Sequence, residues 1–338
     1  MVVGEILKIS RVLKLIAVFA VTSIASLGTA SASPDPAKIV GPNACAECHK
    51  SETAAWKTSH HFSTFRDMPR GKDTKAIAKK MGIKRVKADS LCLDCHFTSQ
   101  VVKNKPKPIA GISCESCHSQ GKDWLKIHSE FSGKKKATES KAQAADRWKK
   151  AEAAGMIRPK ALYDLAKNCY SCHVVPQEKL VNVGGHSAGS AFELVSWSQG
   201  EVRHNSWYTK GNTPASANRK RIMYVVGLAV ELESSLRAVG KATQKKAYAV
   251  SMARRASAAR KKLIKVAKAL PDAKELLEII KASKSAKLKL NNDAALSAAA
   301  DKVAMATLAV LGKYDGSAFG GVDKLIPGAD KYKGKAAQ

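Results

Sequence analysis

The sequence predicts a mainly α-helical protein made of two unlike parts. Apolar residues recur three and four positions apart through most of residues 213–312, a pattern typical of amphipathic helices. Before them, residues 33–212 contain four copies of a Cys-x-x-Cys-His pentapeptide, separated by basic, loop-rich segments. We therefore expect the first part to be organised around what these pentapeptides bind, and the second around an antiparallel helical core.

The pentapeptides have the spacing of c-type haem attachment sites. Two thiols three residues apart can each bond to one vinyl group of the same haem, and the adjacent imidazole then reaches the iron. The pattern predicts four covalently attached haem c groups. The predicted attachment residues are Cys45, Cys48, Cys92, Cys95, Cys114, Cys117, Cys169 and Cys172. The predicted proximal iron ligands are His49, His96, His118 and His173.

Zinc and disulfides are the alternative uses of such cysteine pairs. Histidine makes up only 9 of 338 residues, so its presence directly after all four pairs favours haem over a zinc or redox-dithiol site. All 8 cysteines are used in this way, which leaves none for a separate disulfide framework.

Four irons with one proximal histidine each still need a second axial ligand. All five remaining histidines lie in the first part of the chain, and neutral imidazole is a good iron ligand. We expect the distal ligands to be His61, His128, His186 and His204, with His61 favoured over its neighbour His60. Met68, Met81 and Met156 rank below them, because a lone methionine is usually a core residue. Histidine ligation predicts low reduction potentials.

The N-terminus has the pattern of a secretory signal peptide. Three basic residues precede an apolar run from Leu15 to Leu27, and small residues follow up to Ala32. This run is shorter than the roughly 20 residues that span a bilayer. We expect residues 1–32 to be cleaved and the mature chain to be exported to the periplasm.

The chain is strongly basic, with a formal net charge of +30 that falls to +28 without the signal segment. Such a field attracts acidic partners and makes encounter rates salt-dependent. The expected partners are an acidic redox protein or an anionic membrane surface. Export from the cytoplasm argues against nucleic acid as a binding partner.

The other segments are predicted from local composition. Lys103–Pro108 is expected to be an exposed, partly polyproline-like link, and 134–150 a solvated helix. Residues 213–315 are expected to form three or four antiparallel helices with boundaries near Pro271 and Asn291, serving as a brace or as a docking or oligomerisation surface. Residues 316–338 are expected to be a flexible basic tail.

Three places in the haem region, residues 33–212, resemble a known family, the tetrahaem cytochrome c-554 family of periplasmic electron carriers. They are the run Trp56-x-x-Ser59-x-His61, the Cys114-Glu-Ser-Cys117-His118 motif followed by His128, and the pair Gly185-His186. The resemblance covers roughly residues 40 to 210. It implies a mostly helical fold with little strand and haem pairs in parallel and perpendicular stacking.

The resemblance also bears on function. In the best-known members the electron donor is an octahaem hydroxylamine-oxidising enzyme, and one haem lacks a sixth protein ligand. This chain departs from them in having enough histidines for all four irons and in carrying the basic helical extension.

Three functions are compatible with these features. The first is an electron carrier. The second is a haem enzyme with one open iron acting on a small nitrogen oxide or hydroxylamine, in which His60 or Arg203 serves as a proton or charge donor. The third is a subunit of a larger redox assembly.

Overall fold

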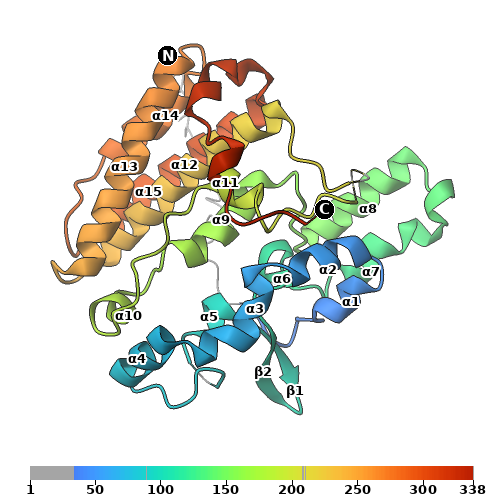
Figure 1. Ribbon diagram of the computed structural model, residues 1–338. Coiled ribbons are helices and arrows are strands. Elements are labelled where there is room, and N and C mark those ends of the chain that lie inside the picture. The colour runs from blue at the N-terminus through green and yellow to red at the C-terminus, as the bar shows by residue number, and fades with distance from the viewer. Residues whose placement is uncertain (1–33, 89, 208, 210, 338) are drawn as a thin grey trace, which may run out of the picture.

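The computed structural model describes residues 34–88, 90–207, 209 and 211–337. Across these residues the protein is mainly α-helical, with one two-stranded sheet, as the sequence predicts (Figure 1). The expected signal peptide lies outside the described residues, so that expectation stays a prediction.

The haem region is built from short helices joined by loops. Its α-helices are α1 Pro42–Ala46, α2 Lys50–Lys57, α3 His60–Asp67, α4 Lys72–Met81, α5 Leu93–His96, α6 Cys114–His118, α7 Leu125–Ser129, α8 Lys141–Ala153, α9 Leu162–His173, α10 Glu178–Asn182 and α11 Leu194–Ser198. Three short 3-10 turns, Met68–Arg70, Phe131–Gly133 and Lys136–Thr138, lie between them. The helix expected over residues 134–150 is therefore shorter than predicted.

The expected polyproline-like link is instead a β-hairpin. Strand β1, Thr98–Val102, pairs antiparallel with β2, Lys105–Ala110. The turn residues Lys103 and Asn104 both have positive φ, 50° and 59°, as a two-residue hairpin turn of the primed kind requires. The prolines do not prevent pairing, because β2 is an edge strand of a two-stranded sheet.

The extension forms four helices around one apolar core. They are α12 Ala217–Lys241, α13 Ala247–Ala269, α14 Glu275–Lys284 and α15 Asp293–Lys313. The central helix α12 contacts both α13 and α15, and α14 lies against α15. Pro271 and Asn291 fall between helices, as predicted.

Helix α15 is long and apolar enough to cross a membrane by length and composition alone. Its inner face is nevertheless part of the protein core, with Leu296, Val303 and Val310 fully buried. Such a helix is equally typical of the core of a globular domain.

The core does not stop at the expected domain boundary at residue 213. Helix α9 packs on α12, and Tyr163 of α9 donates a hydrogen bond of 2.7 Å to the buried carboxylate of Glu233 of α12. One continuous cluster of buried apolar side chains runs from Leu162 to Val322. The extension is therefore packed against the end of the haem region rather than linked to it loosely.

The last segment also differs from the flexible tail that we expected. A 3-10 helix, η4 Ser317–Leu325, buries Phe319 and Val322 against the bundle, and η5, Ala329–Lys331, follows it. Lys333 then exchanges backbone hydrogen bonds with Ser196 and Glu201. Two apolar anchors and these backbone contacts hold a segment that composition alone marks as mobile.

Candidate haem sites

Each Cys-x-x-Cys-His motif lies on a helix end. Helices α5, α6 and α9 end at His96, His118 and His173, while the first motif spans the junction between α1 and α2. One helical turn places residues three apart on the same face, so both thiols of a motif face the same side. All 8 cysteines are free thiols in the structure. We number the sites 1 to 4 in chain order.

The structure brings every motif histidine next to one of the four expected distal histidines. Between ring centroids, His49 lies 6.3 Å from His128, and His96 lies 6.3 Å from His186. His118 lies 6.1 Å from His204, and His173 lies 6.4 Å from His61. The ring planes differ by 10° at site 1, 53° at site 2, 90° at site 3 and 49° at site 4.

These separations fit one metal ion between each pair of rings. A metal–imidazole bond is about 2.0–2.1 Å long and the ring centroid lies about 1.1–1.2 Å behind the nitrogen, so rings on opposite sides of one ion have centroids about 6.2–6.6 Å apart. The four observed separations lie within about 0.1 Å of this range.

Hydrogen bonds at Nδ1 of five of these histidines are compatible with iron binding through Nε2. The Nδ1 atoms of His118, His128, His186 and His204 lie 2.6–2.8 Å from backbone carbonyl oxygens, to which only a protonated nitrogen can donate. Nδ1 of His173 lies 2.7 Å from Oγ of Ser190. Donation from Nδ1 leaves Nε2 as the free base, and metal-bound histidines are commonly fixed in this way.

Burial keeps the rings neutral. It lowers the pKa of His96 to about 4, helped by the nearby His186. It also lowers the pKa of His173 to about 4, with a further contribution from His61. Both rings are therefore unprotonated at neutral pH, as a ligand must be.

The adjacent residues His60 and His61 have different environments. The His61 ring is directed towards His173, whereas the His60 ring is exposed and its Nδ1 lies 2.6 Å from Oε2 of Glu201. Gly111 passes so close to the His61 carbonyl that a Cβ there would lie 2.2 Å from the oxygen. This close approach fixes the start of α3, and the directions of the two rings favour His61 over His60 as the ligand.

Contacts between the thiols give the sites a spatial order. Cys45 of site 1 is within hydrogen-bonding reach of Cys114 of site 3. Cys95 of site 2 is likewise next to Cys172 of site 4, and Cys117 of site 3 is near that same Cys172. The sites therefore follow one another in space as 1, 3, 4 and 2, which differs from their order in the chain.

Comparison with known proteins agrees with this geometry. Residues 44–119, which contain the first three motifs, match the family described as cytochrome c554 and c-prime. Cytochrome c-554 of Nitrosomonas europaea is 30% identical over 120 residues, which are 33% of this chain and 48% of that protein. The chain thus spans about half the length of this curated relative. No solved structure matches the chain.

Residues 44–119 are therefore similar to the cytochrome c554 family. The resemblance expected from the sequence is confirmed for this segment.

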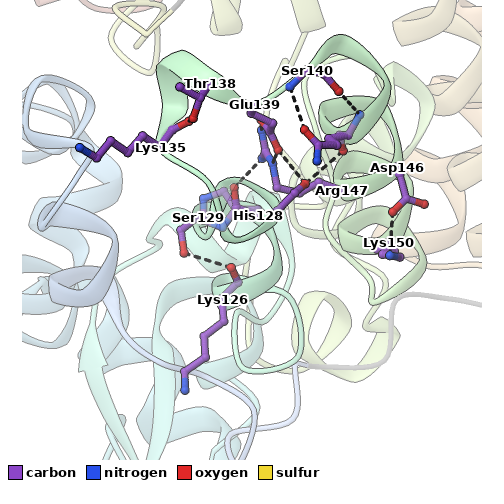
Figure 2. Close-up of polar contacts among 12 residues, drawn as sticks. Lys126, His128, Ser129, Lys135, Thr138, Glu139, Ser140, Asp146, Arg147 and Lys150 are labelled. Carbon is purple, nitrogen blue, oxygen red and sulfur yellow. Dashed lines mark hydrogen bonds and ion pairs between the residues drawn. The ribbon is translucent and has the colours of Figure 1, made fainter.

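A buried ion pair that the sequence did not reveal supports site 1. Arg147 of α8 contacts both carboxylate oxygens of Glu139, at 2.6 and 2.7 Å, and donates a 2.6 Å hydrogen bond to the His128 carbonyl (Figure 2). Both side chains are almost fully buried. A two-pronged arginine–carboxylate contact is geometrically specific, so it holds the end of α7 and the His128 ring in place.

The helical extension reaches site 4. Arg255 of α13 donates a 2.7 Å hydrogen bond to the carbonyl of Ser190, whose hydroxyl contacts the His173 ring. Glu231 of α12 pairs with the same guanidinium at 3.2 Å. Because these helices fix the residue that orients a motif histidine, their contacts support the brace interpretation of the extension.

Two other charged residues have positions that composition did not indicate. Glu115, inside the third motif, is buried and accepts backbone hydrogen bonds from Val40, Gly41 and Gly121 at 2.7–3.0 Å, so it ties the N-terminal segment to site 3. Arg203 donates to the Gln199 carbonyl at 3.3 Å, while its buried Nε has no hydrogen-bond partner among the described residues. That donor suits a haem propionate next to His204.

Proposed function

We propose that the chain is a periplasmic tetrahaem c-type cytochrome that transfers electrons between redox partners through four bis-histidine haems. The observation that carries the proposal is the set of four histidine pairs, each with the centroid separation expected across one iron. Bound haem supplies a one-electron couple at each site.

The geometry supports a specific ligand set. We assign His49 and His128 to site 1, and His96 and His186 to site 2. We assign His118 and His204 to site 3, and His173 and His61 to site 4. The cysteines of each motif hold the corresponding haem. The protein's own contribution is to keep the buried His96 and His173 rings neutral and to hold each pair of rings at ligating distance.

The spatial order of the thiols supports a linear path for electrons. Cys45 lies within hydrogen-bonding reach of Cys114, Cys117 lies near Cys172, and Cys172 lies within hydrogen-bonding reach of Cys95. Sites 1 and 2 are the two ends of this order, so we propose that electrons enter and leave there. The partners that we propose are acidic redox proteins, with an anionic membrane surface and self-association through the C-terminal helices as further modes of contact.

Electron paramagnetic resonance of the ferric holoprotein tests the ligand set. We expect every haem to be low-spin and none to bind added nitric oxide. Replacing His61 by Ala should convert one quarter of the haem signal to high-spin. Replacing the neighbouring His60 by Ala should convert none.

A high-spin haem in the native protein would overturn the assignment. If that haem took up nitric oxide, the enzyme with one open iron would become the better description. Intact mass provides an independent count, since the proposal requires four attached haems.

A further inference from the structure

A basic groove lies beside site 2, at one end of the cytochrome. It has a volume near 460 Å³ and is lined by helix α4 and the segment that follows it. We call it the α4 groove; its lining residues are Pro69, Lys75, Ala78, Lys79, Ile83, Lys84, Arg85, Val86 and Lys87. Figure 1 shows α4 at the edge of the molecule, on the opposite side from α7 and α8.

The groove concentrates positive charge without internal compensation. Residues 69–87 contain eight basic residues and one acidic residue. No groove lysine or arginine forms an ion pair within the part of the chain that the structure describes, although 15 such pairs occur elsewhere in it. Burial, together with repulsion from Arg70, lowers the pKa of Lys87. An anion in the groove would relieve this repulsion.

The groove is connected to both ligand segments of site 2. Nζ of Lys87 lies 3.4 Å from the Phe65 ring centroid and 5.7 Å from that of Phe97. Phe97 directly follows the motif histidine His96.

On its other side α4 contacts the His186 loop. A Cβ on Gly184 would lie 3.1 Å from the Met81 side chain, and one on Gly185 would lie 3.2 Å from Nζ of Lys80. An object bound in the groove would therefore sit next to the last haem site of the spatial order.

We propose that the α4 groove receives acidic side chains of a protein redox partner and so places that partner at site 2. The inference rests on the proposed electron-transfer function and names where one partner docks. A hollow lined by five cations admits protruding carboxylates, which a flat bilayer surface does not offer. Electrostatic attraction of this kind raises association rates and fades with salt.

Photoreduction of the ferric holoprotein by two flavin semiquinones tests the proposal. Riboflavin is neutral, and flavin mononucleotide adds a phosphate to the same ring. At low salt we expect the phosphorylated flavin to reduce the protein faster than riboflavin does. The double variant K79E/K84E should lower the ratio of the two reduction rates, phosphorylated flavin over riboflavin, by a factor of about five or more. It should leave the riboflavin rate unchanged.

The matched control is K281E/K284E, which makes the same charge change at two exposed lysines of α14. It should keep most of the advantage. If both double variants lose it equally, the effect belongs to net charge and the proposed groove is wrong. If K79E/K84E retains it, the groove is wrong as well.

A competition step identifies the class of ligand. A polyglutamate peptide should slow reduction by the phosphorylated flavin in the native protein and have little effect on K79E/K84E. If inorganic phosphate at the same charge concentration competes equally well, the groove is a small-anion site and the acidic-partner proposal fails. Failure of riboflavin to reduce native haem would instead count against the proposed electron-transfer function.

Discussion

The two parts of this protein are stabilised by different means. Among the residues that the structure describes before position 162, only eight apolar side chains are buried: Ile39, Ala55, Ala78, Cys92, Phe97, Ala110, Trp124 and Ala151. The four helices of the extension instead bury long apolar faces, with Leu232, Leu263 and Leu276 fully inaccessible. The comparison indicates that residues 34–161 have too small an apolar core to fold by burial alone. Under the proposed function, haem supplies much of their interior.

Removal of the haems should give the largest effect. In a variant with all eight cysteines replaced by Ser, we expect residues 34–161 to lose their fold and α12–α15 to persist, because only the latter have an apolar core of their own. Limited proteolysis with mass spectrometry would show early cleavage before residue 162 and protection of residues 217–313. Equal protection of both parts, relative to the holoprotein, would contradict the comparison.

A cavity in the extension should give the next largest effect. Replacing the fully buried Leu263 by Ala is expected to lower the free energy of unfolding by about 2–5 kcal/mol, through lost burial and an unfilled cavity. Thermal melting followed by far-UV circular dichroism measures it.

Leu277 provides the control for this substitution, because it is 55% exposed on the neighbouring helix α14. Its replacement by Ala should change the unfolding free energy by no more than about 0.5 kcal/mol. Equal losses for the two leucines would show that the extension is not held by its apolar core.

The two parts also differed in how well the sequence predicted them. The period of apolar residues predicted the helices of the extension, and Pro271 and Asn291 marked real boundaries, because local propensity and burial act together there. In the haem region the motif spacing predicts four sites, and the structure places one expected distal histidine next to each motif histidine. The spacing did not predict which distal histidine pairs with which motif, since His61 and His173 come from segments far apart in the chain.

The remaining differences between the sequence predictions and the structure have local physical reasons. The hairpin was missed because a primed turn at Lys103 and Asn104 outweighed the two prolines of an edge strand. The C-terminal tail was missed because two apolar residues, Phe319 and Val322, anchor an otherwise polar segment. The buried ion pair of Arg147 was not predicted, because Arg147 lies in a lysine-rich helix whose composition does not distinguish a buried guanidinium from a solvated one.

The Arg147–Glu139 pair tests whether polar contacts hold the haem region. Replacing Arg147 by Met leaves a buried carboxylate without its partner, and we expect the melting temperature to fall by about 5 °C with a change in the site 1 spectrum. Replacing Lys150 by Ala is the control, since its partner Asp146 on the same helix is exposed. A similar shift in both variants would exclude a special role for the buried pair.

The same ion pair should make stability depend on pH. Hydrogen bonding to Arg147 lowers the pKa of Glu139 below its usual 4.5, so its contribution is complete above about pH 4.5 and is lost as the pH falls through the lowered value. Glu139→Gln should flatten this acid limb of the melting-temperature profile. An unchanged profile would show that other carboxylates dominate acid unfolding.

The smallest effect is expected from the ion pair at the far end of the bundle. Lys313 of α15 lies 2.8 Å from Glu275 of α14 and, with Tyr314, holds the pKa of that carboxyl at about 2. The pair is nevertheless at the surface, where solvent screens it, and α14 is attached through the buried Leu276 and Ile279. Lys313→Ala should therefore shift the melting temperature by no more than about 2 °C, and only above about pH 2, where Glu275 is ionised. A shift as large as that of Arg147→Met would mean that charge pairs matter as much in the extension as in the haem region, and the contrast between the two parts would no longer hold.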